Sequence, residues 1–277
     1  MTPPVDPTVW ICATCGVEHV DGQGVCPICA DERQYVPASG QRWATLAQLA
    51  ADGHRTRLRE SEPGLQQLTV EPAVGIGQTA FLVTSDAGSV LWDPPGFLDD
   101  AAVERVRSGG KVLAITSSHP HMFGAQLEWS RRLDDAPVLV CEPNLQWLSR
   151  TGAAVATWSG RHEIVSGLTL HQLGGHFRGS AVLHWPAGAE GRGVLLTSDT
   201  IHGNPDRATV TFLRSYPNRI PLSPEVVQRI ATAAEQLSFD RLYDNFGRGV
   251  DPDARAAVRR SAERYIAWVR GDHDDLT

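Results

Sequence analysis

Two closely spaced cysteine pairs near the N-terminus constrain the fold of this chain more than any other feature. Cys12 and Cys15 form one C-x2-C pair, and Cys26 and Cys29 form a second pair after a spacer of ten residues. Each pair directs two sulfur atoms into one turn, and two facing turns supply four thiolates in a tetrahedron. Because residues 10–37 are too few to bury a core, a bound metal must supply their folding energy. The sequence therefore predicts a small metal knuckle at residues 10–37.

The WICATCG and CPIC pieces of this segment resemble both zinc ribbons and rubredoxin-like modules. Rubredoxins usually have a longer spacer and a glycine after the last cysteine, where Ala30 stands here. Four thiolates suit zinc and iron alike. Structural zinc is therefore favoured, and iron in the knuckle stays the alternative. His19 lies inside the spacer and is expected at the surface, because four cysteines already fill the coordination sphere.

The remaining 240 residues are enough for one further, larger domain. Residues 1–9 are expected to be a flexible N-terminus, and residues 38–66 a connecting helix and linker. In residues 67–277, apolar runs between Gly and Asp turns predict strands, and amphipathic segments such as LSPEVVQRIATAAEQLS predict helices. Early strands, alternation in the middle and later hairpins predict an α/β fold with two mixed sheets and helices outside them.

Composition and charge limit the classes of partner that the chain is expected to bind. The chain is 42% apolar and 21% charged, with a formal net charge of -7, which is ordinary for a soluble globular protein. An acidic chain without basic clusters is a poor candidate for binding nucleic acid or an anionic membrane surface. The N-terminal residues resemble no signal peptide, and no apolar run approaches the roughly 18 residues of a membrane span. A cytoplasmic location is therefore expected, whereas the oligomeric state is not predicted.

Four polar residues at strand ends or in loops are candidates for one metal site. His119 and His121 follow the apolar run KVLAIT, and residues two apart in an extended segment point the same way. His176 follows a double glycine in LGGHFRGS, and Asp199 ends the apolar run GVLLTSD. Functional sites are normally built at such positions on a rigid scaffold.

The order of these motifs resembles the metallo-β-lactamase superfamily over residues 67 to about 250. That family has HxH after a strand, a later GH loop, and then an Asp after a strand. VLWDPPG, HFRGSAVLHW and SDTIHG match further segments of its pattern. The resemblance implies an αββα sandwich of the metallo-β-lactamase type. It also implies one zinc or other divalent metal held by His119, His121, His176 and Asp199.

The family's fuller pattern is H-x-H-x-D-H, with a last histidine near the C-terminus. Here Phe123 and Gly124 stand at the Asp and second His positions, and RLYDNFGRG contains no histidine. The first metal position thus keeps its ligands, and the second keeps only the shared Asp199. Asp93, in VLWDPPG, matches the family's carboxylate that orients a ligand histidine.

The resemblance implies a metal-dependent hydrolase with a mononuclear centre, acting on an ester, thioester or lactam-like bond of a small molecule. Because Phe123 cannot orient water, such a hydrolase needs another base, and Asp199 and His202 are the candidates. Four loop residues are candidates for lining the substrate pocket: Arg178, Arg214, Tyr216 and Asn218.

Two other functions stay open at this point. The lost second metal position is also typical of a non-catalytic binding protein with a vestigial site. A redox protein with an iron-loaded knuckle is the third hypothesis, because rubredoxin-like modules joined to this fold occur in the flavodiiron family. That family needs a two-iron site with carboxylates and a flavodoxin domain, and neither is evident in this sequence.

Overall fold

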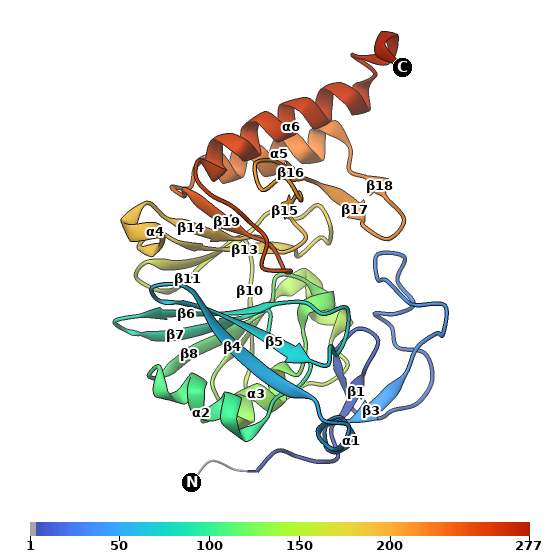
Figure 1. Cartoon of the computed structure of the whole chain (residues 1–277), viewed down its shortest axis with the longest axis vertical. Coiled ribbons are helices and arrows are strands. Elements are labelled where there is room, and N and C mark those ends of the chain that lie inside the picture. Colours follow the sequence, from blue (N-terminus) through green and yellow to red (C-terminus); the bar gives the residue numbers. More distant parts are fainter. Residues whose placement is uncertain (1–3) are drawn as a thin grey trace. The chain divides into compact units, whose positions relative to one another are not determined.

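Short apolar runs form the strands of two large sheets, one in each of the two units into which the chain divides. The structure is a computed structural model and describes residues 4–277. The first unit extends through Trp158, and the second runs from Ser159 to Thr277. Figure 1 shows a mixed sheet with helices in each of them. The α/β class and the two mixed sheets predicted from the sequence are confirmed.

The cysteine-rich segment forms a small sheet in the first unit. Its strands are β1 (Trp10–Cys12), β2 (Glu18–His19) and β3 (Trp43–Thr45), and β1 pairs antiparallel with both others. Helix α1 (Leu46–Ala51) follows with a capping box, in which Thr45 and Gln48 satisfy each other's backbone N–H groups. Ile11 and Ile28 are buried in the same apolar cluster as the large sheet of this unit. The module therefore shares a core with the domain behind it and does not depend on the metal alone.

The large sheet of the first unit has seven strands in the order β10-β9-β8-β7-β6-β5-β4. Strands β4 to β7 pair antiparallel, and β7 to β10 pair parallel. Helices α2 (Asp100–Ser108) and α3 (Gln126–Arg132) pack on it, with Val103, Val106 and Trp129 in the common core. The strands are β4 (Arg55–Glu62), β5 (Leu65–Glu71), β6 (Ala80–Ser85), β7 (Gly88–Trp92), β8 (Val112–Thr116), β9 (Val138–Cys141) and β10 (Val155–Trp158).

Two expectations about connecting segments are corrected. Most of residues 54–64, expected as part of a linker, form β4 at the edge of the large sheet. Its charged residues alternate with inward residues such as Thr56, and charge is how natural edge strands avoid further pairing. Residues 4–9, expected to be flexible, lie on the unit: Val9 is buried, and the N–H of Asp6 donates to Glu128 Oε1 at 2.8 Å. Residues 1–3 lie outside the described residues.

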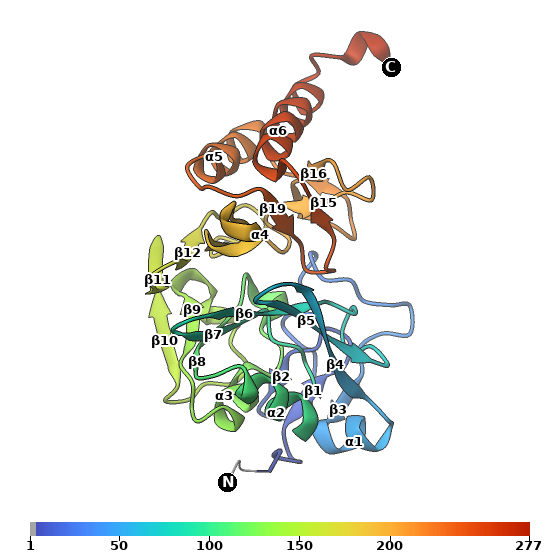
Figure 2. The ribbon, with the colours of Figure 1, turned by 60° about the vertical axis from the view of Figure 1, so that its left-hand side comes forward.

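The second unit is built on a six-stranded sheet in the order β11-β12-β13-β14-β19-β20, antiparallel except for β14 and β19. Helices α5 (Pro224–Glu235) and α6 (Ala254–Arg270) lie side by side in Figures 1 and 2 and share a core with this sheet. The sheet strands are β11 (Arg161–Val165), β12 (Leu168–Gln172), β13 (Ala181–Trp185), β14 (Val194–Leu196), β19 (Arg241–Tyr243) and β20 (Gly249–Val250).

Short elements complete the two units. Two small hairpins in the second unit pair β15 (His202–Gly203) with β16 (Val210–Thr211) and β17 (Leu213–Ser215) with β18 (Ile220–Pro221). The remaining helices are η1 (Pro120–Met122), η2 (Glu142–Trp147), α4 (Gly188–Gly191) and η3 (Asp274–Leu276).

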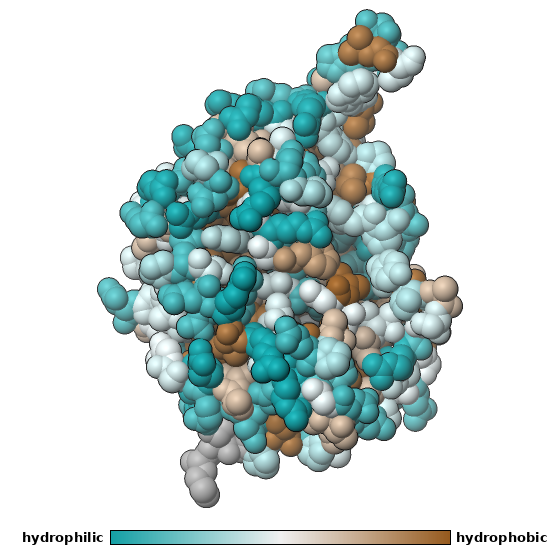
Figure 3. Space-filling model, viewed as in Figure 1, coloured by the Kyte–Doolittle hydropathy of each residue, from teal (hydrophilic) through white to brown (hydrophobic). Residues whose placement is uncertain are grey.

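Hydrophilic residues dominate the face in Figure 3. No helix within residues 4–277 has the length and apolar character needed to cross a bilayer.

Two neighbouring histidines, one half-buried and one buried, make the stability of the second unit sensitive to acid. His171 on β12 and His184 on β13 have ring centroids 6.1 Å apart. Burial, with the charges of His184 and Arg161 added, lowers the pKa of His171 to about 4, and burial also lowers the pKa of His184. An unfolded histidine titrates near its ordinary pKa of about 6.5. The unfolded chain therefore binds more protons between about pH 6.5 and pH 4.

We expect the free energy of unfolding to fall as the pH falls through that window, because a lowered folded-state pKa of a base favours unfolding in acid. Replacing His171 by Gln removes one titrating group and should reduce this pH dependence. Urea unfolding of both proteins at about pH 7 and about pH 4.5 measures it. An unchanged pH dependence in His171→Gln would contradict this assignment.

Candidate metal centres

The four cysteines of the first unit converge on one point. One ligand sulfur from each of Cys12, Cys15, Cys26 and Cys29 lies within 4.8 Å of all the others. The Sγ atoms of Cys12 and Cys29 are 3.5 Å apart, and those of Cys15 and Cys26 are 3.7 Å apart. All four thiols are free, and burial raises the pKa of Cys15 well above its usual range. A cation would stabilise the thiolates here, and the donor set fits one tetrahedral zinc or iron.

His19 belongs to this cluster, so the expectation of a surface histidine is wrong. It is buried, its Nε2 lies 3.3 Å from Cys26 Sγ, and its ring packs edge-on against Trp43 at 4.7 Å between centroids. The pairing of β2 with β1 turns its side chain toward the cysteines. An imidazole N–H at this position can donate to a thiolate ligand, which is a common way to tune a metal–sulfur site.

The loop that contains His119, Pro120 and His121, called the HPH loop below, follows β8, as the sequence predicts. The rings of His119 and His121 lie side by side, with centroids 5.1 Å apart. Asp93, which follows β7 with a positive φ of 54°, accepts hydrogen bonds from Ser118 N at 2.6 Å and Ser118 Oγ at 3.0 Å. Ser118 Oγ in turn lies 2.9 Å from His119 Nδ1. Because the Ser118 hydroxyl donates to Asp93, it accepts from the Nδ1–H of His119. Asp93 thus fixes His119 through Ser118 and leaves the lone pair on Nε2.

The GH loop and the end of β14 place two further predicted ligands in the second unit. His176 Nδ1 lies 3.3 Å from the carbonyl oxygen of Leu213, to which its N–H donates. Its Nε2 lies 3.8 Å from Asp199 Oδ2. His176 therefore has the same tautomer as His119, and a carboxylate stands beside its Nε2. Both residues are buried.

His202 lies between two carboxylates. Its Nδ1 is 3.5 Å from Asp199 Oδ1, and its Nε2 is 3.5 Å from Asp244 Oδ2. Arg248 Nη1 lies 3.4 Å from the same Nε2. Asp244 is fully buried at the end of β19, where burial raises its pKa. RLYDNFGRG lacks the family's last histidine but carries Asp244 directly after a strand, which is the same signal that singles out Asp199 in the sequence.

The four predicted substrate-pocket residues differ in their surroundings. Tyr216 donates its hydroxyl to the carbonyl oxygen of Asp199 at 3.1 Å, and burial raises the pKa of Tyr216 well above its usual range. Arg214 Nη1 donates to the carbonyl oxygen of His176 at 3.4 Å. Arg178 and Asn218 are exposed. Arg214 and Tyr216 therefore contact the backbone of predicted metal ligands.

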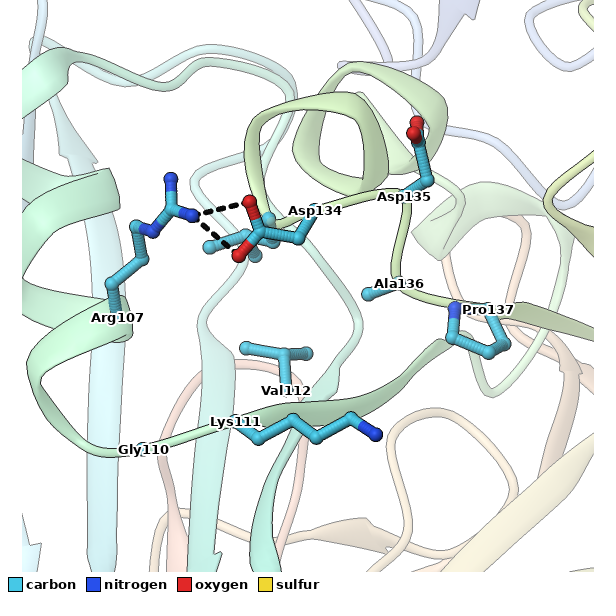
Figure 4. A pocket seen from close by; sticks show the side chains of 9 residues that line it. Arg107, Gly110, Lys111, Val112, Asp134, Asp135, Ala136 and Pro137 are labelled. Atoms are coloured by element: carbon cyan, nitrogen blue, oxygen red, sulfur yellow. Dashed lines mark hydrogen bonds and ion pairs between the residues drawn. The ribbon is translucent and has the colours of Figure 1, made fainter. Parts of the chain in front are cut away.

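The first unit has a surface cavity of about 460 Å³, lined in part by Arg107, Lys111 and Asp134. Figure 4 shows Arg107 directed at the carboxylate of Asp134, with the cationic side chain of Lys111 nearby. The cavity adjoins the beginning of β8, whereas His119 and His121 follow the end of the same strand. This charged cavity is therefore separate from the HPH loop.

The position of Gly124 explains why a second metal position of the usual kind is absent from the HPH loop. Gly124 has a φ of 54°, and a Cβ placed on it would lie 1.8 Å from the carbonyl oxygen of Pro94. No side chain fits there, least of all an imidazole. Phe123, at the position of the family's Asp, is buried in the core of the unit.

Comparison with solved structures identifies the class of fold. The chain matches DIM-1 metallo-β-lactamase with a TM-score of 0.54 and 13% identity, covering 76% of this chain and 98% of that one. It matches VMB-1 with a TM-score of 0.57 and 13% identity, covering 78% and 98%. It also matches the metal-soaked Flv1 flavodiiron core of Synechocystis sp. PCC6803 with a TM-score of 0.52 and 12% identity, covering 77% and 61%.

The chain thus has the metallo-β-lactamase fold, with an N-terminal module of four clustered cysteines. No family model matches it. Its sequence is 42% identical over 268 residues to the uncharacterized protein YmaE of Bacillus subtilis strain 168, covering 95% of this chain and 97% of YmaE. The chain belongs to the same family as YmaE.

Replacing Gly124 by Ala should destabilise the protein by at least about 2 kcal/mol, because a methyl group would collide with the Pro94 backbone. Gly53→Ala is the matched control: its φ is also positive, at 88°, but no atom lies within 4 Å of the added Cβ. We expect the control to lose only about 1 kcal/mol, from backbone strain. Chemical denaturation measures both, and equal losses would contradict the steric argument.

Proposed function

We propose that this protein is a metal-dependent hydrolase with a mononuclear centre, acting on an ester, thioester or lactam-like bond of a small molecule. The observation that carries the proposal is the common tautomer of His119 and His176. Each has its Nδ1–H engaged, one by Ser118 and the other by the carbonyl oxygen of Leu213. Metal-ligating histidines almost always donate their second ring N–H in this way. The metallo-β-lactamase fold supports the same reading.

In this proposal one zinc or other divalent metal is held by His119, His121, His176 and Asp199, and a structural zinc by the four cysteines. Three imidazoles and a carboxylate are an ordinary donor set for such a cation. A metal there would supply Lewis acidity toward the carbonyl oxygen of the substrate. The cytoplasm is the proposed location, and neither nucleic acid nor a membrane is a proposed partner.

The chain's own residues would move the proton. His202 is the proposed general base, with Asp199 as the second candidate, because the Asp and His of the family's second position are absent. Asp244 Oδ2, 3.5 Å from His202 Nε2, would orient the ring and stabilise its protonated form. Tyr216 donates its hydroxyl to the Asp199 carbonyl oxygen, and its ring packs against His202 at 4.7 Å between centroids. Arg178, Arg214, Tyr216 and Asn218 are the proposed lining of the substrate pocket.

Two alternative functions are each favoured by one observation. The steric exclusion at Gly124 suits a non-catalytic binding protein that no longer needs two metals. The imidazole of His19 beside Cys26 suits a redox protein with iron in the cysteine cluster. Metal analysis separates these three functions, because they differ in which site is loaded and with which element.

Replacing His119 or His176 by Ala should remove one metal equivalent per chain, abolish hydrolysis of a panel of small esters, thioesters and lactams, and leave the cysteine-bound metal in place. Elemental analysis and the panel measure these results, with His162→Ala as a histidine control outside the proposed ligand set. Full hydrolysis by metal-free protein would contradict the proposal. So would a wild-type protein whose only metal is lost when the four cysteines are replaced.

Replacing His202 by Ala should lower kcat by about 10²- to 10⁴-fold, the usual contribution of a general base, while the metal content stays unchanged. Asp244→Asn should cause a smaller loss, because the ring remains but its orientation is less well fixed. Steady-state kinetics with the best substrate of the panel, together with elemental analysis, measures both. Unchanged kcat in His202→Ala would leave Asp199 as the base.

A further inference from the structure

The four-cysteine module contacts the segment that carries the first two histidines. The N–H of Glu18, on β2, donates to the carbonyl oxygen of Gly124 at 3.0 Å. The backbones also approach closely at Gly96, where an added Cβ would lie 2.2 Å from the carbonyl oxygen of Gly16. Gln78 Nε2 donates to the carbonyl oxygen of Cys15 at 3.3 Å. The module is therefore seated on the same loops that follow β7 and β8.

Glu18 also places its carboxylate at the start of the helix that follows the HPH loop. Helix α3 begins at Gln126, and its N-cap residue, Ala125, has no side chain that can accept a hydrogen bond. Glu18 Oε1 accepts from Leu127 N at 2.6 Å instead. A carboxylate at a helix N-terminus satisfies an otherwise unpaired amide and interacts favourably with the helix dipole. The cap of α3 is thus supplied by a residue 109 positions earlier in the chain.

An arginine holds this carboxylate in place. Arg150 Nη1 lies 2.5 Å from Glu18 Oε2, and the Glu18 side chain is only 3% exposed. Burial raises the pKa of Glu18 to about 7, against the opposing effects of Arg150 and of the Leu127 amide. Burying a carboxylate is costly unless it is paired and hydrogen-bonded, and Arg150 and the Leu127 amide supply these partners.

The HPH loop is therefore anchored at both ends. At its beginning, Asp93 N donates to the carbonyl oxygen of Thr116 at 2.9 Å, and the Asp93 carboxylate binds Ser118. At its end, Glu18 binds Gly124 and Leu127. The first anchor belongs to the domain itself, and the second belongs to the four-cysteine module.

We propose that the four-cysteine module positions His119 and His121, and that Glu18 is the positioning residue that transmits the order of the module to the HPH loop. The module would act through the backbone of residues 124–127, without contact with substrate. This inference deepens the proposed function, because it makes the order of the histidine loop depend on the structural metal. Its test is chosen so that it does not require metal at the histidines.

The first measurement is hydrogen–deuterium exchange of the full-length, zinc-loaded protein. In Glu18→Ala we expect exchange of amides in residues 118–128 to accelerate by about tenfold, because the variant loses the cap on Leu127 N and the ion pair with Arg150 but keeps the backbone bond to Gly124. Amides of β12 and β13, in the second unit, should keep their wild-type rates. Glu163→Ala is the control, since Glu163 is exposed in the second unit and its carboxylate pairs with exposed Arg161. Wild-type rates throughout residues 118–128 in Glu18→Ala would overturn the proposal.

A second variant guards against a general loss of folding. Glu18→Gln keeps the size of the side chain and one acceptor for the Leu127 amide but loses the ion pair with Arg150. We expect intermediate acceleration confined to residues 118–128. Replacing Cys26 and Cys29 by Ser, which removes the structural metal, should reproduce the Glu18→Ala pattern. A protected loop in that double variant would overturn the role of the module.

Cobalt binding then separates this inference from the proposed function. Thiolate-to-cobalt charge-transfer bands report the cysteine site alone, whereas total cobalt reports both sites. If wild-type protein binds cobalt only at the cysteines, the proposed hydrolase fails, and the exchange data still decide whether the module orders the loop. If both sites bind, Glu18→Ala should weaken cobalt binding at the histidines while the charge-transfer bands persist. Undiminished binding there would overturn the proposal.

Discussion

The parallel pairing of β7, β8 and β9 is the constraint on which the chemistry of the first unit depends. Strands that pair in parallel end at the same edge of a sheet, and ligands of α/β proteins bind beyond the carboxyl ends of the strands. Asp93 follows β7, and Ser118 and His119 follow the neighbouring β8. The carboxylate and the imidazole thus meet through one serine hydroxyl because of the register of two buried strands.

The second unit also places carboxylates beyond the ends of a parallel pair of strands. Strands β14 and β19 are its parallel pair, and Asp199 and Asp244 follow their ends. His202 lies between these two carboxylates, and Tyr216 holds the backbone of one of them. Burying a carboxylate without partners is costly. Both units nevertheless place buried carboxylates after the ends of strands, so polar groups are concentrated at these strand ends.

The HPH loop shows how a metal-binding motif can be shortened without losing its first half. Gly124 packs its backbone against Pro94 on one side, and its carbonyl oxygen accepts the N–H of Glu18 on the other. The space that a second histidine would fill is therefore taken by main chain. The four-cysteine module is one of the two neighbours, so the presence of the module and the shortened motif are two aspects of one packing arrangement.

The sequence by itself determined the local patterns: the two cysteine pairs, the histidines after β8, the helical segment that forms α5, and the α/β class. Each of these depends on residues a few positions apart, whose spacing fixes how side chains point. Only the tertiary structure decided the positions and contacts of Glu18, His19 and Asp244, and the strand formed by residues 55–62. Glu18 reaches Leu127 and Arg150 across 109 and 132 positions, and no local periodicity encodes such a contact. Register between distant strands and the exclusion of side chains by neighbouring backbone decide it instead.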